Sequence, residues 1–264
     1  MAMLQKKSIP QDLELSIIIP VKDEVENIAG LVEELEAAMA PVSYGWECVW
    51  VDDGSTDKTL EELKKLKRRR QHHEYITLSR NYGQAAAFHA GFCHARGRLL
   101  ATMDGDGQND PRDLPALVSR LLRDGLDMVN GVRIRRRDTV VRKICSRIAN
   151  GFRNWMTGEQ ITDVGCSLRV FRRACVRHVP LFKGTHRFLP TLVRIQGWSK
   201  IVEMPVGHRP RRYGKTKYGI HNRLWVGLLD TLAVRWMQGR MVYAELREAS
   251  FSDVTSEKED NRQR

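Results

Sequence analysis

The chain has 264 residues, of which 42% are hydrophobic, and a formal net charge of +12 at pH 7. This length suits one large domain, alone or with a small appendage, and allows an ample core. The positive charge predicts an anionic partner, which is a nucleic acid, an acidic membrane surface or a phosphorylated substrate. Five cysteines without CxxC spacing exclude a disulfide framework and a cysteine-rich zinc site, so we expect reduced thiols, mostly in the core.

The first residues do not have the pattern of a secretory signal peptide, because residues 1–14 carry four charged side chains and no apolar stretch. No run reaches the roughly 18 apolar residues that a membrane-spanning helix needs. The best candidate, residues 224–234, is interrupted by Asp230. We therefore expect a cytoplasmic protein that is soluble or peripheral on the inner face of the membrane.

The first 103 residues alternate between short apolar runs rich in β-branched residues and longer stretches with helical spacing. In chain order we predict a strand over 15–20, a helix over 25–40, a strand over 48–51, a helix over 57–70, a strand over 75–78, a helix over 85–96 and a strand over 99–103. This alternation is typical of βαβ units. It predicts an α/β fold with a mostly parallel, Rossmann-like sheet flanked by helices.

Residues 223–246 have the pattern of a C-terminal amphipathic helix. Its apolar positions recur at the spacing of one helical face, and they are Trp225, Leu228, Leu229, Leu232 and Trp236. This face either packs on the domain or on a second copy of the chain, or lies in a membrane interface with its tryptophans at headgroup depth. Residues 247–264 are polar, and we expect them to be disordered.

Acidic residues follow three of the predicted strands. Lys22-Asp23-Glu24 comes after the first strand, Asp52-Asp53 after the second, and Asp104-Gly-Asp106 after the fourth. Because ligands of such sheets bind beyond the carboxyl ends of the strands, these acids are predicted to share one binding edge.

Asp104 and Asp106 are close enough in sequence to converge on one point if Gly105 lets the backbone fold tightly. Two such carboxylates repel each other without a cation. With Gln108 nearby, the oxygen ligands suit Mg²⁺ or Mn²⁺. The alternative is a solvated turn whose aspartates cap the helix that begins near Asp113.

Asp52 and Asp53 have two compatible interpretations. Either carboxylate is suited to accept hydrogen bonds from a base or a ribose. The residues after them, Ser55, Thr56 or Asp57, are typical caps for the next helix.

Seven ordered motifs between residues 14 and 222 resemble those of family 2 glycosyltransferases with the GT-A fold, and in particular the polyprenyl-phosphate glycosyltransferases. The motifs are IIIPVKDEVEN, VDDGSTDKT, SRNYGQAAAFHAG, MDGDGQNDP, R-x-x-x-S-x-x-x-N (Arg142, Ser146, Asn150), DVGCSLRVFRR and RRYGKTKYG. The resemblance implies a catalytic domain over 1–222, and the residue pattern predicts a membrane-interface helix over 223–246 and a polar tail over 247–264.

The resemblance also implies site residues of three kinds. They are Pro20, Glu24, Asp52, Asp53, Asp104, Arg211 and Lys217 for the nucleotide sugar; Asp104, Asp106 and Gln108 for Mg²⁺ or Mn²⁺; and Arg133, Arg142 and Ser146 for the acceptor phosphate. Asp104, Asp106, Arg133 and Arg142 are the expected catalytic residues. Asp23 and Thr216 replace the family's usual asparagine and serine, and Lys215 makes the last motif more basic than usual.

The expected reaction is inverting transfer of a sugar from a nucleotide diphosphate to a polyprenyl phosphate, whose anionic oxygen needs no strong general base. Arginines suit this acceptor because each presents a planar fork of donors. Asp163 is a candidate for orienting an arginine or the sugar hydroxyls, or else a simple cap. Expected partners are the nucleotide sugar, the polyprenyl phosphate, the membrane surface and a small integral membrane partner.

Four alternatives remain open. A nucleic-acid binder fits the basic stretches over 133–153 and 207–223, but has no use for acids at three strand ends. The others are a subunit that binds nucleotide sugar without transferring it, a basic membrane-surface adaptor, and a family 2 transferase that acts on a carbohydrate hydroxyl. That last enzyme needs an acid near the acceptor, and residues 157–163 offer only separated acids.

Overall fold

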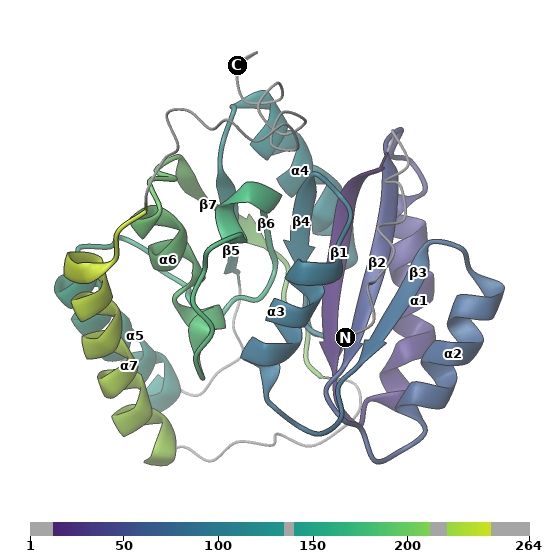
Figure 1. Ribbon diagram of the computed structural model, residues 1–264, viewed down its shortest axis with the longest axis horizontal. Helices are drawn as coiled ribbons and strands as arrows, with labels where there is room; N and C mark the ends of the chain where they lie inside the picture. Colours follow the sequence, from purple (N-terminus) through teal and green to yellow (C-terminus); the bar gives the residue numbers. More distant parts are fainter. Residues whose placement is uncertain (1–12, 135–139, 212–220, 244–264) are drawn as a thin grey trace, which may run out of the picture.

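The computed structural model describes residues 13–134, 140–211 and 221–243; for 140–148 and 221–225 it describes the backbone alone (Figure 1). At the centre lies a seven-stranded sheet with the strand order β3-β2-β1-β4-β6-β5-β7. The strands are β1 (Leu13–Val21), β2 (Gly45–Asp52), β3 (His73–Thr77), β4 (Leu99–Thr102), β5 (Met128–Arg133), β6 (Arg169–Arg172) and β7 (Ile201–Val206). Among the described strands, only β6 runs antiparallel to its neighbours. The predicted mostly parallel α/β fold is confirmed.

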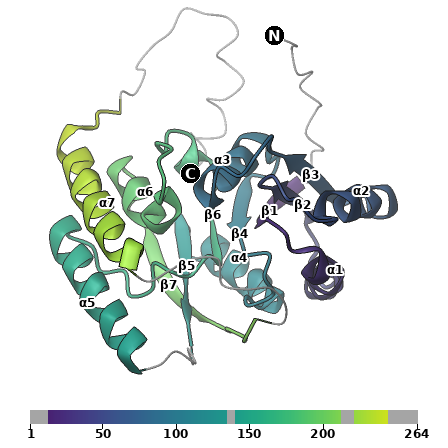
Figure 2. The ribbon, with the colours of Figure 1, turned by 90° about the horizontal axis from the view of Figure 1, so that it is seen from below.

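Helices cover both faces of this sheet (Figures 1 and 2). They are α1 (Val25–Met39), α2 (Thr59–Arg69), α3 (Gln84–His94), α4 (Leu114–Arg123), α5 (Val140–Thr157), α6 (Leu189–Ile195) and α7 (His221–Arg240). Side chains of α1, α2 and α4 join the core cluster on one face, and those of α3, α6 and α7 join the cluster on the other.

Strand β1 shows why the apolar runs form central strands. Ile17 and Ile19 pack into one core cluster, whereas Ile18 packs into the other, and all three are fully buried. Successive side chains of a strand point to opposite faces, so a strand covered on both sides is apolar at every position. The uninterrupted run of three isoleucines therefore specifies a strand inside a three-layer fold.

A helix at the C-terminal position is confirmed, and α7 ends at Arg240, before residue 246 of the predicted range. It packs beside α5 at one end of the molecule (Figures 1 and 2). Its inward positions include the buried Thr231 and Val234, whereas Leu229 and Trp236 of the predicted apolar face are 64% and 65% exposed. These two side chains of the predicted face therefore do not pack on the domain. The amphipathic, interfacial character of α7 is not confirmed and stays a prediction.

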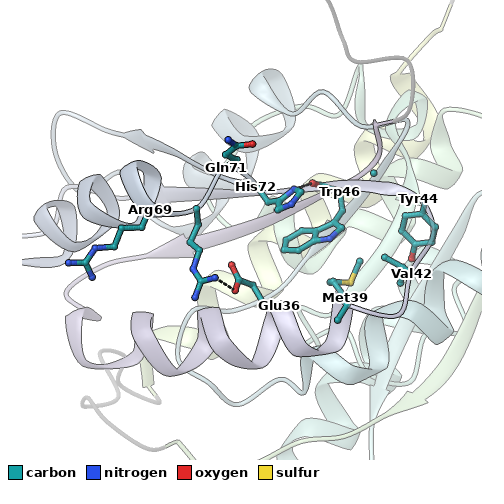
Figure 3. A pocket seen from close by; sticks show the side chains of 11 residues that line it. Glu36, Met39, Val42, Tyr44, Trp46, Arg69, Gln71 and His72 are labelled. Carbon is teal, nitrogen blue, oxygen red and sulfur yellow. Dashed lines mark hydrogen bonds and ion pairs between the residues drawn. The ribbon is translucent and has the colours of Figure 1, made fainter.

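A cavity of about 600 Å³ lies at the edge of the sheet where β2 and β3 begin (Figure 3). The stacked rings of Trp46 and His72 lie in its wall, and Glu36 pairs across it with Arg70. Behind this wall lies His73, which is 1% exposed. Trp50 Nε1 donates to His73 Nδ1 at 3.0 Å, which places the proton of the neutral imidazole on Nε2, 3.4 Å from Glu36.

We expect His73 to make folding stability depend on pH. Burial lowers its pKa to about 4, although Glu36 acts in the opposite direction. Between pH 6.5 and pH 4 the imidazole is protonated in the unfolded chain but stays neutral in the folded chain, so the stability falls as the pH is lowered through this range. Below pH 4 both states are protonated, and the contribution of His73 no longer changes with pH. The expected loss at pH 5 is about 2 kcal/mol relative to pH 7.

Urea unfolding of wild type and of His73→Asn at pH 7 and pH 5 measures this contribution. Asparagine keeps an acceptor near the position of Nδ1 for Trp50, but does not titrate. The difference in unfolding free energy between the two pH values should shrink by about 2 kcal/mol in the variant. His94→Asn, at an exposed position on α3, is the control. If His73→Asn has the same pH dependence of stability as wild type, His73 is not the group responsible for it.

Candidate functional site

The predicted acids lie together because of the order of the strands. Strand β1 lies between β2 and β4, with Val21 in register with Asp52 and Ile18 with Thr102. The chain thus reverses direction across the sheet at β1. Loops that leave the carboxyl ends of such strands diverge and form a crevice, which is where open α/β sheets bind ligands.

Asp104 and Asp106 lie in the loop that follows β4. Gln84 of α3 donates from Nε2 to Asp104 Oδ1 at 2.7 Å, and the Asp104 backbone N–H donates to Asn109 Oδ1. Asp106, which is 8% exposed, accepts from the Gln108 backbone N–H. These bonds fix both carboxylates relative to the end of the strand.

Two glycines shape this loop for different reasons. Gly107 has a φ of 73°, a conformation that disfavours side chains. At Gly105 space is the limit, because a Cβ there would lie 2.5 Å from Val21 Cγ1 and 3.0 Å from the Pro20 carbonyl oxygen. Gly105 is therefore needed for close approach to the end of β1, where Pro20 lies, and the contact of Pro20 with a nucleotide stays a prediction.

The electrostatics of the pair fit a divalent cation. Burial and, after it, the nearby Asp106 carboxylate raise the pKa of the Asp104 carboxyl to about 6. Gln108 donates from Nε2 to the Arg209 carbonyl, and its Oε1 accepts no hydrogen bond within the described part of the chain. Over that same part, no three His, Cys, Asp or Glu side chains form a metal cluster. Two carboxylates and one amide oxygen suit Mg²⁺ or Mn²⁺, which take further ligands from water and phosphates.

Arg211 neutralises part of this charge. Its Nη2 lies 2.7 Å from Asp106 Oδ2 and its Nη1 lies 4.0 Å from Glu24 Oε1. Three of the predicted donor and metal residues therefore meet at one place. Lys217, also predicted for the donor, lies outside the described residues, as do Thr216 and Lys215.

Asp52 and Asp53 have local partners that the motif did not indicate. Asp52 accepts from the Ser55 backbone N–H and from Thr77 Oγ1, both at 2.9 Å. Asp53 accepts from the backbone N–H groups of Tyr82 and Gly83, at 2.7 and 2.8 Å. They are 1% and 5% exposed, respectively. Both carboxylates thus fix the loops at the ends of β2 and β3, and their contact with a nucleotide stays a prediction.

The capping alternative holds for a different aspartate of the cluster. Asp110 accepts from the Arg112 backbone N–H at the start of the short 3-10 helix Pro111–Asp113, which precedes α4. The guanidinium groups of Arg112 and Arg209 hold the pKa of Asp110 well below its usual range. The acidic stretch therefore divides into a pair that faces the crevice and one that caps a helix.

Arg133, the last residue of β5, is held rigidly by Asp163. The carboxylate accepts from Arg133 Nε at 2.7 Å, from Nη2 at 2.8 Å and from its backbone N–H at 3.2 Å. Asp163 thus orients an arginine, which is one of its three predicted roles. A Cβ on Gly165 would lie 2.7 Å from Arg133 Nη2, so the glycine of this motif makes room for the guanidinium.

Two other residues predicted for the acceptor, Arg142 and Ser146, belong to α5, but their side chains lie outside the described part. Arg133 Nη1 makes no hydrogen bond to any described residue, which leaves it available to an anion. The attraction between Arg133 and Asp104 lowers the pKa of Asp104. The predicted acceptor arginine and the acidic pair are therefore electrostatically coupled at one edge of the sheet.

Sequence reasoning assigned no role to three residues of this region. Gln84 binds Asp104, Asn150 donates to the Thr162 carbonyl, and Glu203 of β7 accepts from Thr162 and Asp163. Gln84 and Asn150 lie inside two of the family motifs, and those motifs could have indicated them. Glu203 lies outside every motif.

The chain matches the glycosyl transferase family 2 over residues 16–179. It is 44% identical over 227 residues to a dodecaprenyl-phosphate galacturonate synthase of Rhizobium johnstonii, covering 85% of this chain and 67% of that protein. It is 37% identical over 206 residues to an undecaprenyl-phosphate 4-deoxy-4-formamido-L-arabinose transferase of Salmonella paratyphi A. That match covers 78% of this chain and 62% of the relative, so the chain spans less than two thirds of the second protein.

Two solved structures have a similar fold. One is glucosyl-3-phosphoglycerate synthase of Mycobacterium tuberculosis with Mn²⁺, UDP and phosphoglyceric acid (TM-score 0.63, 16% identity, 88% of this chain and 80% of that chain). The other is a mannosyltransferase of Pyrobaculum calidifontis with GDP-Man and Mn²⁺ (TM-score 0.58, 17% identity, 88% and 66%). The predicted GT-A-like fold is confirmed by these neighbours. The chain therefore belongs to glycosyl transferase family 2, and the resemblance to polyprenyl-phosphate sugar transferases that its motifs indicate is confirmed.

Proposed function

We propose that the chain transfers a sugar, with inversion, from a nucleotide diphosphate to a polyprenyl phosphate at the inner face of the membrane. The observation that carries the proposal is the pairing of two kinds of site at one edge of the sheet. Asp104 and Asp106 form an acidic pair that needs a cation, and Arg133, which binds Asp163 through Nε and Nη2, lies close enough for its charge to lower the pKa of Asp104. A diphosphate held by a cation and a second phosphate held by an arginine are the two anions of this reaction.

Each residue has a distinct part in the proposal. Asp104, Asp106 and Gln108 would hold Mg²⁺ or Mn²⁺, which when bound supplies positive charge to the leaving diphosphate. Arg211 already lies 2.7 Å from Asp106 and is placed to contact the same diphosphate. Arg133, with the predicted Arg142 and Ser146, would hold the acceptor phosphate in line with the anomeric carbon. This contribution is one of orientation and charge.

The acceptor explains why the site needs no strong general base. A phosphate monoester oxygen is already anionic near neutral pH, so no proton has to be removed before attack. Asp163 is 4% exposed and both of its carboxylate oxygens accept hydrogen bonds from Arg133. It is therefore a poor candidate for the base that a hydroxyl acceptor would require.

We further propose that α5 and α7 face the membrane. Both helices present aromatic side chains to solvent, and Trp155 on α5 and Trp236 on α7 are 77% and 65% exposed. Tryptophans at a bilayer surface insert their rings at headgroup depth. No helix in the described residues has the length and apolar composition to cross a membrane. A peripheral contact, or a separate small membrane partner, would bring the lipid phosphate to the site.

We expect the double variant Leu229→Ser/Trp236→Ser to bind anionic lipid vesicles less tightly than wild type by about tenfold or more, because two apolar side chains no longer enter the interface. Vesicle co-sedimentation measures this, with Leu122→Ser, an exposed leucine on α4, as the matched control. Equal vesicle binding by the double variant and the control would contradict the membrane contact of α7. A concentration-dependent dimer that forms in wild type and is lost in the double variant would show that this face of α7 binds a second copy of the chain.

Transfer of radiolabel from a panel of nucleotide sugars to undecaprenyl phosphate tests the reaction. The assay is run with Mg²⁺, with Mn²⁺ and with EDTA. Metal-dependent label in the lipid phase from one donor supports the proposal and names the sugar. Metal-dependent transfer to a carbohydrate acceptor, without label in lipid, would instead identify a family 2 transferase that acts on a hydroxyl.

A further inference from the structure

The turn at residues 161–163 connects two parts of the predicted acceptor site. On one side it presents the Asp163 carboxylate, which binds the Arg133 guanidinium through two nitrogens. On the other side it contacts α5, the helix that carries Arg142 and Ser146. A turn has few hydrogen bonds of its own, so its position depends on the groups that bind it.

Glu203 of β7 binds this turn more extensively than any other described side chain. Its Oε2 accepts from Thr162 Oγ1 at 2.7 Å, and its Oε1 accepts from the backbone N–H groups of Thr162 at 3.0 Å and Asp163 at 3.4 Å. Asn130 Nδ2 donates to the same Oε1 at 3.3 Å. Hydrogen bonds to a charged acceptor are strong, so Glu203 holds the backbone of Thr162 and Asp163 in place.

Strand pairing explains how Glu203 reaches the turn. Asn130 of β5 is in register with Glu203 of β7, and Arg133 lies three residues further along β5. The fully buried Asn130 also accepts from Arg169 Nε at 2.7 Å. The sheet itself therefore supports the carboxylate that holds the turn, and the turn holds the arginine.

On the α5 side, the turn is held by three side chains of one helical segment. Asn150 Nδ2 donates to the Thr162 carbonyl at 2.9 Å, and Asn154 Nδ2 donates to the Ile161 carbonyl at 3.0 Å. Arg153, which is 6% exposed, also donates to Ile161. The last residue of the R-x-x-x-S-x-x-x-N motif thus ties the helix of Arg142 and Ser146 to the turn that fixes Arg133.

We propose that Glu203 is a positioning residue for the acceptor phosphate, acting on Arg133 through the turn at 161–163. Its carboxylate holds Thr162 and Asp163, Asp163 holds two nitrogens of the guanidinium, and Nη1 is thereby aimed at the phosphate. The assignment of the phosphate rests on the proposed function, whereas the effect of Glu203 on Arg133 does not.

The test compares Glu203→Gln with Glu47→Gln as a matched control. Glu47 of β2 is also a carboxylate with several donors, among them Ser16 Oγ and Arg96 Nε, and is 2% exposed. It faces Arg96, at the opposite edge of the sheet from the acids. Both substitutions remove a charge from a hydrogen-bonded cluster, so a general loss of stability appears in both.

We expect Glu203→Gln to raise KM for a short-chain prenyl phosphate by about tenfold or more, because a misplaced arginine binds the anion poorly. KM for the nucleotide sugar and Mg²⁺-dependent nucleotide binding should stay within about twofold. Glu47→Gln should lower the midpoint of urea unfolding and leave both KM values unchanged. Equal changes in both KM values in Glu203→Gln would show a merely structural role and overturn the proposal.

A second readout does not depend on transfer. The ¹⁵N resonance of Arg133 Nε, assigned from its absence in Arg133→Lys, should shift in Glu203→Gln, whereas that of Arg96 should not. Should Glu203→Gln fail to fold, the same measurements are made on Thr162→Val, which removes only the hydroxyl that binds Glu203 Oε2. A shifted Arg133 signal in a protein that uses no prenyl phosphate would refute the proposed function and retain the positioning role. An unshifted signal with an unchanged acceptor KM would overturn the positioning role alone.

Discussion

Asp106→Ala is expected to lower the rate of sugar transfer by about three orders of magnitude or more, because it removes one of two carboxylates proposed to hold the cation that stabilises the leaving diphosphate. Asp106 accepts hydrogen bonds from the Gln108 backbone and from Arg211. Its removal leaves Arg211 near Glu24, so no buried charge is stranded. The loss should therefore appear in catalysis and in metal binding, with unfolding free energy changed by no more than about 1 kcal/mol.

The measurement pairs the transfer assay with Mn²⁺ titration followed by electron paramagnetic resonance in the presence of nucleotide. Asp124→Asn is the control, because Asp124 forms its ion pairs at the surface, with Arg120 and Arg123. Wild-type transfer in the presence of EDTA, or tight Mn²⁺ binding by Asp106→Ala, would refute the assignment of Asp106 to a metal site.

The first half of the fold was predictable because its strands are covered on both faces. The isoleucines of β1 and the Cys48–Val51 run of β2 are apolar at consecutive positions, a pattern that few other structures produce. The later strands lack this pattern for a physical reason. Strands β5, β6 and β7 contain Asn130, Arg169 and Glu203, whose polar groups satisfy one another in the sheet.

The candidate site also has a part that could be predicted from the sequence and a part that could not. Asp104 and Asp106 were predictable because strand order brings carboxyl ends to one edge, and their motif marks that end. The roles of Asp53 and Glu203 were not, because each depends on a backbone N–H far away in sequence. Asp53 binds the backbone of Tyr82, 29 residues on, and Glu203 binds that of Thr162, 41 residues before it. No spacing rule encodes such contacts, since they exist only once the loops have been placed.

Arg133→Lys is expected to lower kcat/KM for the prenyl phosphate by about two orders of magnitude, with KM for the nucleotide sugar unchanged. Lysine keeps the positive charge that the buried Asp163 requires, so the fold should survive. Its ammonium, however, presents three donors from a single point, so it cannot reproduce the planar fork that binds both oxygens of Asp163 and also reach the phosphate. Arg133→Ala would be less informative, because removing the guanidinium that binds both oxygens of the buried Asp163 is expected to cost about 3–5 kcal/mol of stability.

Arg96→Lys is the control for this substitution, because Arg96 also binds a buried carboxylate through two guanidinium nitrogens, which both donate to Glu47 Oε2 at the other edge of the sheet. If both variants lose similar stability but only Arg133→Lys loses acceptor kcat/KM, the loss follows from the position of the guanidinium. Full acceptor kcat/KM in Arg133→Lys would remove Arg133 from the acceptor site. A loss of kcat/KM confined to the nucleotide sugar would place Arg133 on the donor side. Its positive charge, which attracts Asp104, would then act on the diphosphate.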